Sequence, residues 1–151
     1  MILDERNEFA DANTSGVQGA TGSELVGDVI DLGIAGRDVG NGEPLYLVVS
    51  VDVAIASASA GASVEFQLAS DSTADLATSP TVHASTGAKA EAVLVAGAKF
   101  ILPVPLEGSV YERFLGILAV RSGEAVTAGA VSAFLVRDPS AWKAYNAPGQ
   151  V

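Results

Sequence analysis

Apolar and polar residues alternate along several short stretches of the chain, as expected for β-strands with one buried face. The clearest stretches are Pro44–Val53, which follows a Gly-Asn-Gly turn, and Ser63–Ala69. The residues predicted to share the inward face of these two runs are Leu45, Leu47, Val49, Val51, Val64, Phe66 and Leu68. We therefore expect these side chains to point into one common core.

Further strand-like runs are separated by turn residues and short polar loops. They cover residues 25–32, 81–86, 100–104, 112–121 and 130–138. Residues 91–95 are ambiguous, because the overlapping Ala-Lys-Ala-Glu-Ala favours a helical turn whereas Val-Leu-Val favours a strand. Short strands at this spacing, without a convincing amphipathic helix, predict an all-β antiparallel jelly roll or β-sandwich of seven to eight strands.

Three segments are expected along the chain. Residues 1–23 are predicted to be an N-terminal arm, because they combine an acidic stretch with turn and linker composition. Residues 24–138 form the predicted jelly-roll domain, and residues 139–151 an extended C-terminal tail. The arm is either a frayed terminus or a segment that becomes ordered against a partner.

Composition and charge exclude several classes of protein. Hydrophobic residues make up 49% of the 151 residues, which excludes a disordered chain. The net charge of −10, with scattered single bases, argues against a nucleic-acid partner. There is no cysteine, so the fold needs no disulfide. No apolar run approaches the ~20 residues that span a bilayer, and the N-terminus lacks the pattern of a secretion signal, so no membrane partner is expected.

Candidate catalytic and metal-binding chemistry is sparse. His83 is the only histidine, so a three-histidine metal site is impossible within one chain, and a Ser-His-Asp triad would have to use His83 with an unidentified serine. Asp71 and Asp75 could bind calcium from one loop, although a turn held by Asp and Ser side chains is the favoured interpretation. We therefore expect no enzymatic activity and no cofactor.

Carbohydrate binding is the alternative from another functional class. Sandwich lectins stack sugars on exposed aromatic rings, and Trp142 and Tyr145 are aromatic residues outside the predicted strands. In the competing interpretation, both rings anchor the tail onto the domain or onto a neighbouring subunit.

The order of several short segments resembles a known family. Met1-Ile2-Leu3-Asp4 is followed by Val29-Ile30-Asp31-Leu32-Gly33, and Gly36-Arg37-Asp38-Val39-Gly40 comes shortly before Pro44-Leu45-Tyr46-Leu47-Val48-Val49. Ser70-Asp71, Ser79-Pro80-Thr81, Tyr111-Glu112-Arg113-Phe114-Leu115 and the run from Thr127 to Val136 then follow. This order is similar to that of the cement (decoration) proteins of Bordetella-phage-type capsids of tailed phages, over almost the whole chain.

The resemblance implies a jelly roll made in the host bacterial cytoplasm and bound to the outer surface of the virion capsid. There it would clamp neighbouring major capsid proteins of an HK97-type shell. The expected partners are the major capsid protein and a second copy of the chain, with a homodimer favoured over a homotrimer. The residues expected to bind partners are Ile2, Leu3, Phe9, Arg37, Asp38, Trp142 and Tyr145.

Overall fold

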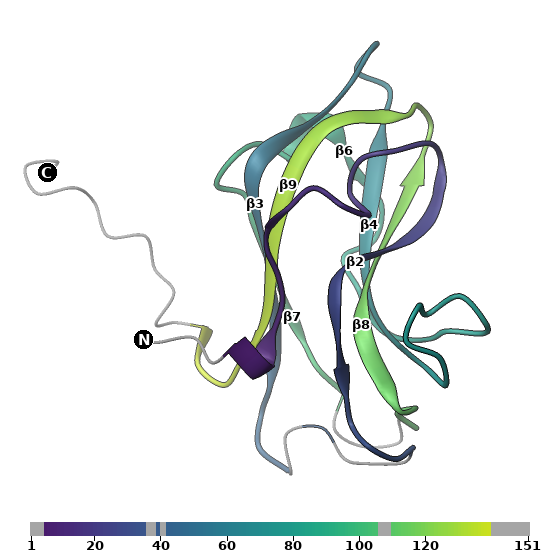
Figure 1. Cartoon of the computed structure of the whole chain (residues 1–151). Helices are drawn as coiled ribbons and strands as arrows, with labels where there is room; N and C mark the ends of the chain where they lie inside the picture. The colour runs from purple at the N-terminus through teal and green to yellow at the C-terminus, as the bar shows by residue number, and fades with distance from the viewer. Residues whose placement is uncertain (1–4, 36–38, 40–41, 106–109, 140–151) are drawn as a thin grey trace, which may run out of the picture.

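The protein is a sandwich of two antiparallel β-sheets (Figure 1). This computed structural model describes residues 5–35, 39, 42–105 and 110–139. Outside the strands, the described residues include two 3₁₀ turns, η1 (Glu5–Asn7) and η2 (Glu91–Val93). Within the described part of the chain, no helix is long and apolar enough to cross a membrane.

The first sheet, sheet A, contains four strands in the order β1-β9-β3-β7. Their bounds are β1 (Glu8–Asn13), β9 (Val126–Val136), β3 (Tyr46–Ser57) and β7 (Lys99–Pro103). The two long strands β3 and β9 form the centre of the sheet, and the shorter β1 and β7 form its edges.

The second sheet, sheet B, has the order β2-β8-β4-β5, and β6 also pairs with β4. Its strands are β2 (Gly22–Asp31), β8 (Phe114–Ser122), β4 (Ser63–Asp71), β5 (Thr81–Ser85) and the two-residue β6 (Lys89–Ala90).

The order of the strands is that of a jelly roll. The first strand, β1, pairs with the last, β9, and the second strand, β2, pairs with the penultimate, β8. Further inward along the chain, β3 pairs with β7 and β4 pairs with β5. Consecutive strands from β1 to β4 thus alternate between the two sheets, as in the double Greek key of a jelly roll. The predicted all-β antiparallel sandwich is confirmed, although the described residues form nine strands rather than the expected seven to eight.

The core lies between the sheets, and the predicted register is confirmed. Leu47, Val49 and Val51 of β3 are fully buried and face sheet B, as the alternation predicted. Val64, Phe66 and Leu68 of β4 meet them from the other side, and Leu45 packs against the same cluster. The ambiguous segment 91–95 forms η2, and Leu94, which follows it, is buried in this core.

The N-terminal segment differs from the expected arm. Residues 8–13 form β1, which hydrogen-bonds to β9, and Phe9 is only 1% exposed within the core. The connection to β2 is also fixed, because Val17 is fully buried. A Cβ at Gly16 (φ +78°) would lie 2.0 Å from the carbonyl oxygen of Leu25. The sandwich therefore begins before residue 24, since an edge strand gains its stability from the partner strand it pairs with.

Candidate interaction surface

One end of the sandwich collects the long connections and both ends of the described chain. In sheet A, Tyr46 at the start of β3 pairs with both Pro103 and Val136, the last residues of β7 and β9. In sheet B, Phe114 at the start of β8 pairs with the last residues of β2 and β4. We call this end, with the described residues 32–35, 42–45, 104–105 and 110–113 and the two described chain ends, the loop end; it is the lower end in Figure 1.

Two isolated apolar side chains protrude at the loop end. Ile34 is 63% exposed and Val110 is 71% exposed, the two highest values among the large hydrophobic residues of the described chain. Their loops are joined at the base, because the Leu32 amide donates a hydrogen bond to the carbonyl oxygen of Arg113 at 2.8 Å. Contiguous apolar patches mark surfaces that bind a protein partner, whereas singly exposed apolar side chains are common on soluble proteins.

A salt bridge holds the base of these loops. The Arg113 guanidinium donates to both carboxylate oxygens of Asp31, at 3.0 and 2.8 Å, and the Gly33 amide donates to one of them. The hydrogen bonds from Arg113, the larger cause, and from the Gly33 amide lower the pKa of Asp31 to about 2. Both charged side chains are about half exposed, so the link orders the loop more than it stabilises the fold.

A second ion pair joins the described C-terminal end to the connection before β3. Arg137 donates to Glu43 at 2.6 Å, and both side chains are well exposed. Together with the Asp31–Arg113 bridge, this pair gives the loop end a mixed charge around its apolar residues.

Beneath the loop end, a polar cluster positions the described residues 104–105 and 110–113. Tyr111 is buried, stacks on His83 at 4.0 Å between ring centroids, and donates to the carbonyl oxygen of Pro105 at 2.6 Å. Ser70 accepts a hydrogen bond from the Glu112 amide, and its Oγ lies 2.7 Å from His83 Nε2. Burial lowers the pKa of His83, although the charge of Glu112 acts in the opposite direction.

The contact between His83 and Ser70 supplies the serine that the triad interpretation lacked. Ser70 is fully buried in the described structure, however, so a substrate carbonyl has no path to its Oγ without a rearrangement. The geometry favours a structural role, in which the serine links β4 to the segment before β8.

The Asp71–Asp75 loop has the geometry of a side-chain-stabilised turn. Asp71 is 1% exposed, and its two carboxylate oxygens accept hydrogen bonds from the amides of Ser72, Thr78 and Ser79. Burial raises its pKa, but these amides together outweigh that effect and leave the pKa lowered. Within the described residues, no group of three His, Asp or Glu side chains is placed to hold a metal ion.

The same loop covers the outer face of sheet B. Leu76, at 2% exposed, packs there with Ala69 and Leu118. Gly116 leaves room for it, because a Cβ at that position would lie 2.8 Å from a methyl carbon of Leu76.

The predicted partner-binding residues have different outcomes. Phe9 is a core residue, so the expectation that it binds a partner is corrected: its side chain packs between the sheets. The other six residues (Ile2, Leu3, Arg37, Asp38, Trp142 and Tyr145) lie outside the described residues. Sequence reasoning missed Ile34 and Val110, for which the available signal was an apolar residue in a segment of otherwise small or polar composition.

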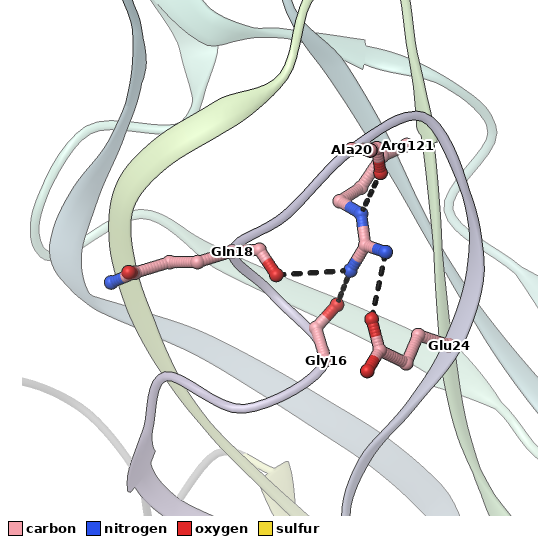
Figure 2. Close-up of polar contacts among 5 residues, drawn as sticks. All are labelled: Gly16, Gln18, Ala20, Glu24 and Arg121. Atoms are coloured by element: carbon pink, nitrogen blue, oxygen red, sulfur yellow. Dashed lines mark hydrogen bonds and ion pairs between the residues drawn. The ribbon is translucent and has the colours of Figure 1, made fainter.

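A second feature that the sequence did not reveal is the anchor of the β1–β2 connection (Figure 2). Arg121 of β8 is only 6% exposed, and its guanidinium points into the loop. It donates to the carbonyl oxygens of Gly16, Gln18 and Ala20 and to the carboxylate of Glu24. One buried side chain thus fixes the whole turn that leads from β1 into sheet B.

Comparison with known proteins assigns the chain to a family. A search of curated proteins finds no match. The profile of the Bbp16 family matches residues 14–135, which is most of the chain and almost all of the sandwich. The name of this family points to a Bordetella phage protein. The chain belongs to the Bbp16 family.

Proposed function

We propose that this protein is a capsid cement protein that binds the outer surface of an HK97-type shell and braces neighbouring major capsid proteins. Its action is binding alone, without a catalytic step or a cofactor. Membership in a family with a phage name supports a virion role, and the resemblance of the segment order to that of capsid cement proteins supports the finer assignment.

The observation that carries the proposal is the convergence at the loop end. The described parts of two connections, residues 32–35, 42–45, 104–105 and 110–113, lie with both described chain ends at one end of the sandwich. A jelly roll with well-packed sheets can present these segments together without changing its own fold. This arrangement suits a protein that contacts two shell subunits at the same time.

The mechanism follows from additive binding energy. Burying the exposed part of Ile34 or Val110, which are 63% and 71% exposed, contributes about 1–2 kcal/mol per side chain. If one copy spans a seam between subunits, opening the seam must also break these contacts. Many copies around a shell therefore raise the barrier to bursting although each contact is modest.

The test uses particles that lack the protein. They should assemble but burst at a lower temperature or under milder osmotic shock, and the added purified protein should restore them. An Ile34→Asp/Val110→Asp double variant should restore them less, with at least about tenfold weaker retention on the shell, because about 1.4 kcal/mol corresponds to a factor of ten.

A matched control separates the loop end from the rest of the surface. Val95 is 53% exposed and lies away from the loop end. Its neighbour Leu94 accepts a hydrogen bond through its carbonyl oxygen from the amide of Ile55, in the half of β3 that is distant from the loop end. Val95→Asp should restore particles as the wild type does. Particles equally robust without the protein would refute the cement role. Full restoration by the double variant would refute only the assignment of the loop end.

Self-association belongs to the same proposal, and a homodimer is favoured over a homotrimer because two-fold symmetry is the commonest solution for small proteins. Sedimentation velocity of the purified protein over a wide concentration range distinguishes the two states from a monomer. The carbohydrate-binding alternative depends on Trp142 and Tyr145, which lie outside the described residues. A glycan array with a Trp142→Ala control tests it directly.

A further inference from the structure

The outer face of sheet A carries a trough that the cement role does not use. It crosses all four strands and has a volume of about 250 Å³. Its lining residues are Glu8, Asp11, Val48, Ser50, Asp52, Lys99, Ser132 and Phe134. Binding pockets for drug-sized ligands are usually larger, at ~300–1,000 Å³, so this trough is suited to a single aromatic side chain with its neighbours.

The floor and rim of the trough differ in chemistry. Val48 and Phe134 form an apolar floor on the face of the sheet that points away from the core. Glu8, Asp11 and Asp52 place three carboxylates on the rim, against the one cation Lys99. Burial and the charges of Asp11 and Glu5 raise the pKa of Glu8, as expected where negative charges face one another. The trough therefore favours a guest with both an aromatic ring and a positive charge.

The chain itself supplies such a segment in the sequence that follows the described C-terminal end. β9, whose Ser132 and Phe134 line the trough, ends at Val136, and the described chain continues only to Pro139. The remaining residues, 140–151, contain Trp142, Lys143 and Tyr145, and Lys143 is the only charged side chain among them. A cationic, aromatic stretch thus follows directly in a protein whose net charge is −10.

We propose that, in the free protein, residues 142–145 of the C-terminal tail dock in the trough of the same chain. The ring of Trp142 enters above the apolar floor, and the Lys143 ammonium group lies among the carboxylates of the rim. The proposal does not depend on the cement role.

The length of the connection permits this docking. Asp138-Pro139 is a favoured pair for the first two positions of a turn. Phe134 lies five residues before Pro139, and the three residues from Pro139 to Trp142 span up to about 10 Å. Four residue steps lead from Phe134 to Asp138, so a reversal at Asp138-Pro139 returns Trp142 to the level of Leu135, one residue short of Phe134 and its cross-strand neighbour Glu8.

Trp142 is the only tryptophan, so its fluorescence reports the docking directly. The experiment measures emission wavelength and quenching by neutral acrylamide in the full-length protein and in three variants. Ser50→Arg fills the trough from its half-buried floor, and Lys143→Glu reverses the tail charge without touching the sandwich. Ala54→Arg is the matched control, because Ala54 is an exposed residue of the same strand and does not line the trough.

A short flexible tail has an effective concentration in the millimolar range. If its intrinsic dissociation constant is also about millimolar, the tail is docked about half of the time. Acrylamide reaches Trp142 only in the undocked state, so the quenching constant of the wild type should be about half that of Ser50→Arg. Lys143→Glu should behave like Ser50→Arg, and Ala54→Arg like the wild type. Three results would overturn the proposal: equal quenching in wild type and Ser50→Arg, an equal effect of Ala54→Arg, or protection that grows with protein concentration. The last result would assign the trough to the tail of a second copy.

Discussion

Replacement of Arg121 by methionine should destabilise the protein far more than an ordinary surface substitution. The guanidinium is 6% exposed and provides donors to three carbonyl oxygens of the β1–β2 connection. Methionine keeps most of the apolar stem, so the loss concerns the hydrogen bonds rather than the packing.

The magnitude follows from the surroundings of each acceptor. Gly16 is buried, so its carbonyl oxygen loses a charged donor without gaining water, at a cost of about 1–3 kcal/mol. Ala20 is exposed and its carbonyl can be hydrated, so its bond of 2.7 Å is worth about 1 kcal/mol net. The bond to Gln18, at 3.3 Å, adds little. Glu24 is 56% exposed and returns to water at almost no cost. The expected total is about 3 kcal/mol.

Urea unfolding measures this difference in the free energy of unfolding. The m-value should stay unchanged, because the substitution alters the native state rather than the area exposed on unfolding. The melting temperature should fall by about 6–12 °C for a domain of this size. Hydrogen exchange should accelerate first in the amides of residues 14–22.

Arg113→Met is the matched control, because it makes the same chemical change at an arginine that is 51% exposed. Its bridge to Asp31 has better geometry than any single Arg121 contact, yet its loss should cost clearly less than the loss of Arg121, since both partners are solvated. Equal effects of the two substitutions, or a loss below about 1 kcal/mol for Arg121→Met, would contradict the argument from burial.

Three further predictions concern the core, the pH dependence and the N-terminus. Phe66→Ala should cost about 3–5 kcal/mol and lower the soluble yield, because Phe66 is fully buried between the sheets; a variant that keeps the wild-type unfolding midpoint would contradict the packing. The pKa of His83 in the folded protein is lowered below 6.5, so below about that pH the unfolded chain binds more protons than the folded protein does. Stability should therefore decrease from about pH 6.5 downward, and His83→Gln should flatten that slope in urea titrations at several pH values. Deleting residues 1–12 should unfold the protein, because it removes most of β1 and the buried Phe9. Circular dichroism measures the loss of structure, and deleting residues 1–4 should leave the fold intact.

The sequence alone determined the fold class and the register of the central strands. The runs around Leu47 and Phe66 alternate strictly, and a one-residue slip would turn each apolar face to water. Turn residues then limited how the strands connect. The single histidine and the lack of cysteine restricted the available site chemistry through composition alone.

The tertiary structure decided where less regular segments belong. Residues 8–13 hold Phe9 among acidic and small residues, and their extended form depends on pairing with β9, about 120 residues later in the chain. The conformation of the loop anchored by Arg121 also depends on a distant part of the chain, because the loop's carbonyl oxygens and the arginine are about 100 residues apart in the sequence.

The candidate interaction surface could not be predicted from the sequence either. Ile34 and Val110 belong to different loops, and only the pairing of β2 with β8 brings those loops to one end of the sandwich. A local pattern reports which face of a strand is buried, since neighbours along the chain determine the alternation. It carries no information on which distant strand lies alongside, because that choice depends on the free energy of the whole packed core.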